Sequence, residues 1–155
     1  AMAKTMKYIS TILASLLTVS TPVSAQEALS FTFPPSADEI IAIEQGGPEL
    51  KVELGRHYFD VKDYEEAFKW YKSAAEEGYA TAQLNLGLIY SHGEMGIPRD
   101  YTLAYMWLSI GATNGSSVAK RWRKKVAGNI SSKGIERAKV MAKTCIESNY
   151  RKCGS

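Results

Sequence analysis

Apolar residues between positions 36 and 147 fall into short helical patterns, and residues that begin or end helices separate them. Ser36 with Glu39, and Asp63 with Glu66, each have the spacing of a capping box, and Asp100 is a further expected N-cap. The sequence therefore predicts an all-α fold. The expected helices cover residues 36–45, 48–59, 64–77, 80–91, 101–114, 116–127 and, from Ser131 or Ser132, a last helix to about 147.

Two of these helix pairs repeat each other. Leu54-Gly55 followed by Tyr58 recurs 32 residues later, at positions 86, 87 and 90. The pattern of small and aromatic residues that begins at Ala67 recurs at Ala104, 37 residues later. The two offsets differ by five residues, which all lie in the turn between the two helices of the pair. A repeat that varies in its turn and keeps its helical positions indicates stacked helix pairs.

The repeated residues have a physical reason to be there. Gly55 and Gly87 lie inside helical patterns, where glycine costs about 1 kcal/mol relative to alanine. A cost repeated at the same register indicates that two helices approach closely. The large aromatic side chains of the repeats are expected to fill the space between helix layers, as core residues rather than as a chemical site: Tyr58, Trp70, Tyr71, Tyr90 and Trp107.

These repeats resemble the Sel-one-like repeat, a relative of the tetratricopeptide repeat. The matching features are A-x-x-x-L-G-x-x-Y-x-x-G, a turn with glycine and proline, and then D-Y-x-x-A-x-x-W-x-x-x-A-x-x-G. The resemblance implies a right-handed α-solenoid with two clear repeats, about 48–79 and 80–115, and a divergent closing repeat at 116–153. The segment 26–47 is then a lead-in followed by a helix that caps the stack.

The resemblance also implies a function. Members of this family bind proteins, often within bacterial envelope or signalling assemblies, so a protein partner is expected on the concave side of the solenoid. Alignment to the tetratricopeptide pattern places six residues on that side: Val52, Arg56, Phe59, Leu84, Leu88 and Ser91.

The first 25 residues have the three parts of a secretory signal peptide. Lys4 and Lys7 give a positive start, residues 9–19 form an apolar run, and Val23-Ser24-Ala25 is a small-residue cleavage site. The run is shorter than the ~20 apolar residues that span a bilayer, although an uncleaved anchor is the alternative. Cleavage after Ala25 predicts a mature chain that begins at Gln26 in the bacterial periplasm or outside the cell.

Charge divides the chain. Residues 26–115 carry six Lys and Arg against fourteen Asp and Glu, a net charge of −8, whereas residues 116–153 carry eleven against two, a net charge of +9. A solvated polar face explains this pattern, and so does a docking surface for an acidic protein, anionic lipid or cell-wall polymer. Head-to-tail self-association also fits, and export argues against nucleic acid. The expected basic patch consists of Lys120, Arg121, Arg123, Lys124, Lys125, Lys133 and Arg137.

Cys145 and Cys153 are the two cysteines, and an even number in an exported chain indicates a disulfide. The resemblance points the same way, because cysteine-rich members of the family bridge helices across this same gap. A catalytic dithiol usually has two intervening residues, and here there are seven.

Few residues suggest chemistry. His57 and His92 have no second ligand at metal-binding spacing, and the sequence has no phosphate loop and no G-x-S-x-G motif, so we expect no metal and no cofactor. Three functions remain open: a protein-binding scaffold without enzymatic activity, a module that docks on an anionic envelope component, and an enzyme that acts on cell-wall material. The sequence favours the scaffold.

Overall fold

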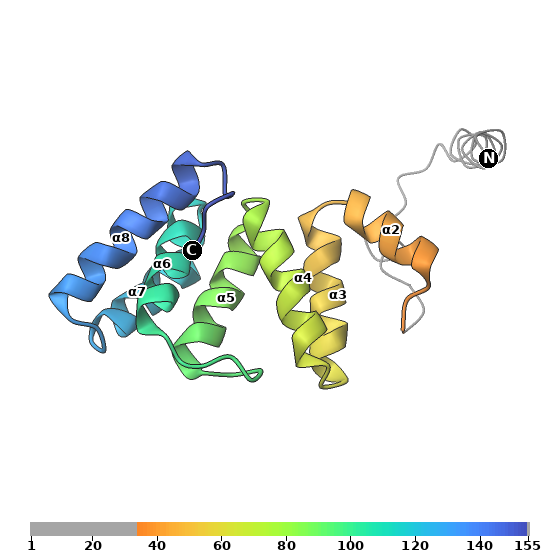
Figure 1. The fold of residues 1–155 in the computed structure, drawn as a ribbon, viewed down its shortest axis with the longest axis horizontal. Coiled ribbons are helices and arrows are strands. Elements are labelled where there is room, and N and C mark those ends of the chain that lie inside the picture. Colours follow the sequence, from red (N-terminus) through yellow and green to blue (C-terminus); the bar gives the residue numbers. More distant parts are fainter. Residues whose placement is uncertain (1–33, 155) are drawn as a thin grey trace. The chain divides into compact units, whose positions relative to one another are not determined.

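The computed structural model describes residues 34–154, and these residues form seven helices and no strand. The helices are α2 (Ala37–Gln45), α3 (Pro48–Asp60), α4 (Tyr64–Glu76), α5 (Ala80–His92), α6 (Tyr101–Thr113), α7 (Ser117–Ala127) and α8 (Ser132–Glu147) (Figure 1). Each lies within a residue or two of its predicted range. The predicted signal peptide, and the lead-in up to residue 33, lie outside the described residues.

The helix starts follow the capping residues of the sequence. Ser36 and Glu39 form a complete capping box at α2, and the Asp100 carboxylate accepts hydrogen bonds from the backbone N–H groups of residues 102 and 103. The second expected capping box is only half formed. Asp63 accepts from the backbone N–H of Glu66, but the N–H of Asp63 donates to the carbonyl of Tyr58, so the Glu66 side chain pairs with Lys69 instead.

The two repeats form packed helix pairs. α3 packs on α4, α5 packs on α6, and α4 and α5 join the pairs into one stack. Glycine makes both pairs close: a Cβ atom at Gly55 would lie 2.9 Å from Cδ1 of Tyr71, and one at Gly87 would lie 2.5 Å from Cγ of Leu108. Both glycines are buried. The predicted α-solenoid, and the predicted reason for its glycines, are therefore confirmed.

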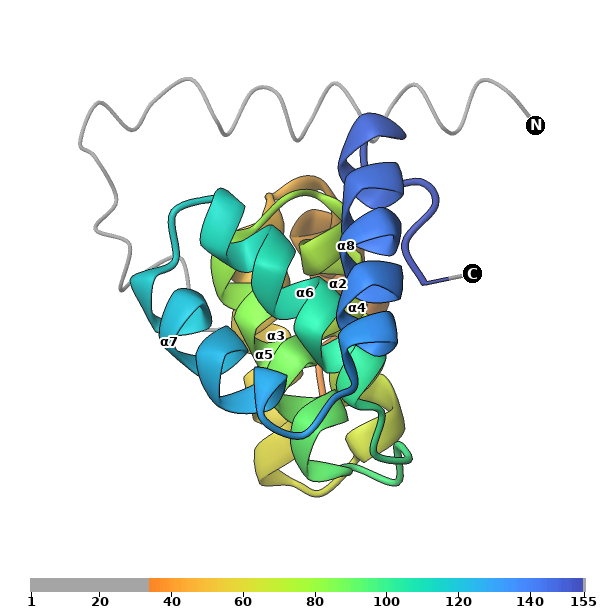
Figure 2. The same ribbon diagram turned by 90° about the vertical axis from the view of Figure 1, so that its left-hand side faces the viewer.

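The third helix pair is built differently. α7 and α8 both pack on α6, while few residues of α7 contact α8 (Figure 2). Ala119 of α7 lies against Gly111 of α6, where a Cβ atom on the glycine would come within 3.3 Å of the Ala119 Cβ. The small residues of α8 that are buried against the core are Ala138, Ala142 and Cys145. The divergent closing repeat is thus an open pair: α7 and α8 pack separately on α6, and α6 itself stays largely buried.

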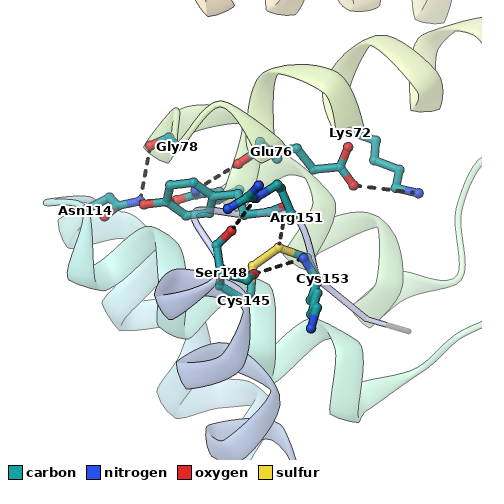
Figure 3. The surroundings of a disulfide bond; sticks show 12 residues. Lys72, Glu76, Gly78, Asn114, Cys145, Ser148, Arg151 and Cys153 are labelled. Carbon is teal, nitrogen blue, oxygen red and sulfur yellow. Dashed lines mark hydrogen bonds and ion pairs between the residues drawn. A yellow bond between two sulfur atoms is a disulfide. The ribbon is translucent and has the colours of Figure 1, made fainter.

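A disulfide joins Cys145, near the end of α8, to Cys153, with Cα atoms 4.5 Å apart (Figure 3). The predicted cysteine pairing is confirmed. The chain reverses after α8 through Asn149 and Tyr150, which both have positive φ, and the Tyr150 N–H donates to the Cys145 carbonyl. We call residues 148–154 the C-terminal hook.

The C-terminal hook contacts the junction between the first two repeats. The Tyr150 ring lies on Gly78, which connects α4 to α5. The amide nitrogen of Asn114 lies 2.9 Å from the Tyr150 hydroxyl, 2.9 Å from Oε1 of Gln83 and 3.1 Å from the Gly78 carbonyl oxygen (Figure 3). Gln83 is fully buried and donates in turn to the Ala75 carbonyl. This polar cluster fastens the last turn of the chain to the middle of the solenoid.

Candidate partner-binding site

A pocket of about 160 Å³ lies where α3, α4 and α5 meet the turn that follows α5. Its walls are largely apolar, with Phe59 from α3, Leu88 and Ile89 from α5, and Met95 from the turn. Phe59 is 41% exposed, an unusual amount for a large aromatic side chain on a helix that is otherwise packed. The pocket is therefore an accessible apolar depression formed by both repeats.

Three residues with polar groups line the same pocket: Tyr71, Asn85 and Glu94. Within residues 34–154, neither the Tyr71 hydroxyl nor the Asn85 amide has a hydrogen-bond partner. Burial raises the pKa of the Tyr71 hydroxyl above its usual value, so it remains a neutral hydrogen-bond donor at physiological pH. A hydroxyl donor and an amide that both donates and accepts are thus available to a ligand.

The turn between α5 and α6 holds Met95 and Glu94 beside the pocket. Gly93 ends α5 in the left-handed conformation, and Met95 itself has a φ of 60°. Arg99 donates to the His92 carbonyl, and the Asp100 N–H donates to the carbonyl of Tyr90. These bonds close the longer turn of the second repeat on itself. The residues that distinguish its length from that of the first repeat thus complete the pocket.

The six residues expected on the concave side do not all lie at this pocket. Phe59 and Leu88 line it together. Arg56 is exposed next to Phe59, and its guanidinium Nη2 lies 2.6 Å from Oε2 of Glu53, which raises the Arg56 pKa. The other three contact the protein itself: Val52 and Leu84 are half-buried against the core, and the buried Ser91 donates its hydroxyl to the Leu88 carbonyl.

Sequence reasoning did not assign five residues that line the pocket: Tyr71, Asn85, Ile89, Glu94 and Met95. Tyr71 was expected in the core and is only 7% exposed, yet it also lines the pocket. Asn85 gave a usable signal, because it is the one amide within the apolar run from Leu84 to Ile89. Glu94 and Met95 gave no such signal in the sequence, since their positions depend on how the turn folds back.

The seven residues of the expected basic patch do not form one surface. Lys120, Arg121 and Lys124 lie together on one side of α7. Arg123 lies on the other side of that helix, and Lys125 covers the Trp122 ring with its Nζ atom 4.3 Å from the ring centre. Arg137 of α8 borders a third depression beside Asp100, and Lys133 is exposed near the start of α8.

Arg123 faces an open groove of about 460 Å³ between α6 and α8. The groove also contains Tyr105, Ser109 and Thr113 from α6 and Lys139, Ala142, Lys143, Ile146 and Glu147 from α8. Lys139 donates to Glu136, which raises the Lys139 pKa, and Lys143 lies 3.7 Å from Glu147. Arg123 has no ion-pair partner among the described residues. The splayed third helix pair thus has an apolar floor with cationic side chains at its rim.

The remaining candidates for chemistry lie apart. His92 ends α5, and its ring meets the Trp122 ring edge-on at 5.5 Å, whereas His57 lies in the last turn of α3. Across residues 34–154, no three His, Cys, Asp or Glu side chains gather closely enough to hold a metal ion. Among these residues there is also no helix with the length and apolar character needed to cross a membrane.

Comparison with known proteins identifies the repeats. The family model of the Sel1 repeat matches residues 53–79 and 80–116. The crystal structure of a protective antigen present in uropathogenic Escherichia coli strains, which displays an SLR fold, superposes with a TM-score of 0.64 at 27% sequence identity. This superposition covers 70% of this chain and 25% of the antigen chain.

Two curated proteins are similar to part of this chain. The ERAD-associated E3 ubiquitin-protein ligase component HRD3 of Candida glabrata is 40% identical over 63 residues, which is 41% of this chain and 7% of HRD3. The DAP3-binding cell death enhancer 1 of Rattus norvegicus is 42% identical over 53 residues, which is 34% of this chain and 10% of that protein. The match spans a tenth or less of the length of these relatives.

Proposed function

Because residues 53–116 of this chain are two Sel1 repeats, we propose that the protein is a non-enzymatic scaffold that binds a segment of another protein. The pocket formed by Phe59, Leu88 and Met95 carries this proposal. Two relatives are named for their association with other proteins, one as a component of an E3 ligase and one as DAP3-binding, which agrees with such a role.

The size of the pocket suits one side chain. Its volume of about 160 Å³ is close to the ~150 Å³ of an apolar cavity that holds benzene. A partner would therefore insert a single large aliphatic or aromatic residue, and such anchors supply most of the binding energy of an interface. Exposed Phe59 would lose its contact with water when the anchor binds.

The polar groups suit the backbone that carries this anchor. A peptide group offers one N–H and one C=O, and the Asn85 amide can accept from the first while the Tyr71 hydroxyl donates to the second. The Glu94 carboxylate at the same rim favours a basic residue beside the anchor. The proposed ligand is thus a peptide segment with one large apolar residue next to a Lys or Arg.

Selection of peptides from a random library displayed on phage tests this function. We expect the chain to enrich peptides with one large apolar residue and an adjacent basic residue. Leu88→Asp should abolish the enrichment, because it places a charge in the apolar wall, and Asn85→Ala should weaken binding of the selected peptide by about fivefold to tenfold.

Val140→Asp is the matched control for Leu88→Asp. Val140 is 64% exposed on α8 and lines none of the pocket, so its variant should enrich the same peptides as the wild-type chain. A library that yields no consensus peptide would contradict the proposed function, as would a consensus peptide that binds the Leu88→Asp variant unchanged.

We also propose that the protein is exported to the periplasm or beyond it. The signal-peptide pattern of residues 1–25 supports this, and so does the disulfide, since disulfides persist in oxidising compartments. After expression in a bacterial host, mass spectrometry of the periplasmic and extracellular fractions should find a chain that begins at Gln26. An intact N-terminus in the cytoplasmic fraction would contradict export.

A further inference from the structure

The two ends of the helix stack have complementary surfaces. At the C-terminal end lies the groove between α6 and α8, with an apolar floor and the cationic side chains of Arg123, Lys139 and Lys143. At the other end lies α2, which has no Lys or Arg (Figure 1). We propose that α2 of one molecule docks in the α6–α8 groove of a second copy, so that the protein assembles head to tail.

The exposed face of α2 has the composition that this groove requires. Ile41 is 50% exposed, and Asp38 and Glu44 lie three residues before and after it, on the same face of the helix. Both acidic residues are exposed, and neither has an ion-pair partner within the described residues. The stripe of α2 is therefore a carboxylate, an apolar side chain and a second carboxylate.

The groove matches this stripe in chemistry. Tyr105, Ala142 and Ile146 offer an apolar surface to Ile41, and the cations at the rim lie beside it. Arg123 lacks a partner in its own chain, and the ion pairs of Lys139 and Lys143 are exposed pairs that contribute little and exchange readily. Docking would therefore give Arg123 a partner, while Lys139 and Lys143 would exchange their exposed pairs with Glu136 and Glu147 for the carboxylates of α2.

The lengths also agree. At about 1.5 Å per residue, Asp38 and Glu44 are about 9 Å apart along α2, and the groove-lining part of α8 from Lys139 to Glu147 is about 12 Å long. The α2 end and the groove lie at opposite ends of the stack, so a molecule cannot fill its own groove. Each molecule instead keeps one free end, which makes the assembly open and concentration-dependent.

The division of charge along the chain favours a second copy over other occupants of the groove. Residues 26–115 have a net charge of −8 and residues 116–153 a net charge of +9, so head-to-tail approach is the orientation in which two copies attract. The attraction is between exposed groups and therefore weakens as salt increases.

Sedimentation velocity of the mature chain, which begins at Gln26, tests the proposal. At low salt we expect the sedimentation coefficient to rise with concentration from that of the monomer, and the rise to vanish at high salt. The double variant Asp38→Lys/Glu44→Lys should be monomeric, because its α2 repels the groove. Arg123→Glu/Lys143→Glu should be monomeric for the converse reason. In each, we expect association to weaken by at least about tenfold.

Mixing the two double variants distinguishes docking from misfolding. The basic α2 of the first variant fits the acidic groove of the second, and the acidic α2 of the second fits the basic groove of the first. An equimolar mixture should therefore associate again, although each variant alone does not. A mixture that stays monomeric would overturn the proposal.

Two controls locate the interface. Lys120→Glu/Lys124→Glu changes the net charge as much as Arg123→Glu/Lys143→Glu, but on the other side of α7, so association should stay within about threefold of wild type. Ile41→Ser should weaken association, whereas Val140→Ser, at a still more exposed apolar residue outside the groove, should not.

A wild-type chain that stays monomeric at every concentration at low salt would overturn the proposal and leave the groove to an acidic segment of another protein. Association that persists in both double variants would place the interface elsewhere. Association that is insensitive to salt would also contradict the docking of α2 by charge.

Discussion

The second and third helix pairs of this solenoid differ in their first helix, where the Leu-Gly of α5 is replaced by Arg123-Lys124 in α7, and their packing also differs. In α5 the glycine is Gly87, which lets Leu108 of α6 approach so closely that a Cβ atom would collide with it. In α7 the corresponding residue is Lys124, which is exposed. The paired helices pack directly in the one case, and in the other they separate and pack on α6 independently.

The difference shows what a glycine contributes to a helix pair. Glycine lowers helix propensity by about 1 kcal/mol relative to alanine, and in exchange the two helices come into direct contact. In the third pair α8 packs on α6 rather than on α7, and a disulfide and the C-terminal hook hold the chain that follows. The groove that we assign to self-association lies between α6 and this separate α8, and Lys124 does not line it. Because α7 and α8 do not pack on each other, the third pair has surface between α6 and α8 that is available for binding.

The largest expected effect is that of filling the close approach in the second pair. Gly87→Val places a branched side chain 2.5 Å from Cγ of Leu108 and 3.3 Å from its backbone nitrogen. Leu108 is fully buried and cannot move away, so we expect a loss of about 3 kcal/mol in the free energy of unfolding. Urea denaturation followed by circular dichroism measures it.

Lys124→Val is the control at the matching position of the third pair. Because Lys124 is exposed, the same new side chain should cost only the ~0.5 kcal/mol of its lower helix propensity. If the two valine variants lost equal stability, glycine would not be the reason for the difference between the pairs.

The next effect concerns the covalent link that only the third pair has. Replacing Cys145 and Cys153 by alanine opens a loop with seven intervening residues, for which chain entropy predicts a loss of about 2–3 kcal/mol. Reduction of the wild-type protein should lower its free energy of unfolding by the same amount, which appears as a lower urea midpoint. Trypsin should also cleave faster after Arg151 and Lys152, because the C-terminal hook would open.

The double alanine variant provides the control for reduction, because reductant should leave its urea midpoint unchanged. A wild-type protein whose stability does not respond to reductant would show that packing alone holds the C-terminal hook. The third pair would then resemble the first two more closely than the structure indicates.

A smaller effect tests how the C-terminal hook fastens to the repeats. Tyr150→Phe keeps the ring on Gly78 and removes the hydroxyl that lies 2.9 Å from the Asn114 amide nitrogen. Since Asn114 retains Gln83 and the Gly78 carbonyl as partners, we expect a loss of about 1 kcal/mol on urea denaturation. Arg151→Ala, which removes an exposed side chain bonded only to the Ser148 carbonyl, should cost less than about 0.5 kcal/mol.

The helices and the paired repeats could be predicted from the sequence because their causes are local. Capping residues such as Ser36 and Asp100, and the repeated Leu-Gly pair, each determine structure within a few residues. The division of the basic patch did not follow from spacing alone, because Lys120 lies three residues from Arg123 and four from Lys124, and both spacings make neighbours on a helix. The structure separates them, with Lys124 beside Lys120 and Arg123 in the α6–α8 groove.

The pocket and the C-terminal hook could not be predicted in the same way. Met95 reaches the pocket because the turn around it folds back, which depends on several backbone bonds at once. Tyr150 lies on Gly78 because α8 packs across α6, a tertiary result that no spacing within the sequence expresses. Phe59 belongs to the first repeat and Leu88 to the second. Alignment to the repeat pattern identified both residues, but it did not identify the other side chains that line the pocket with them.

The smallest expected effect lies on the floor of the open groove. Ser109 is 9% exposed, and its hydroxyl is buried without a hydrogen-bond partner in the described residues. Ser109→Ala removes that unsatisfied group and improves helix propensity, so the free energy of unfolding should rise by about 0.5–1 kcal/mol. Ser91→Ala is the matched change in the paired region, where the hydroxyl does donate to the Leu88 carbonyl, and it should lower stability by a similar amount. If the two variants change the free energy of unfolding in opposite directions, the paired helices satisfy their buried polar groups and the open pair does not. Changes in the same direction would remove that distinction.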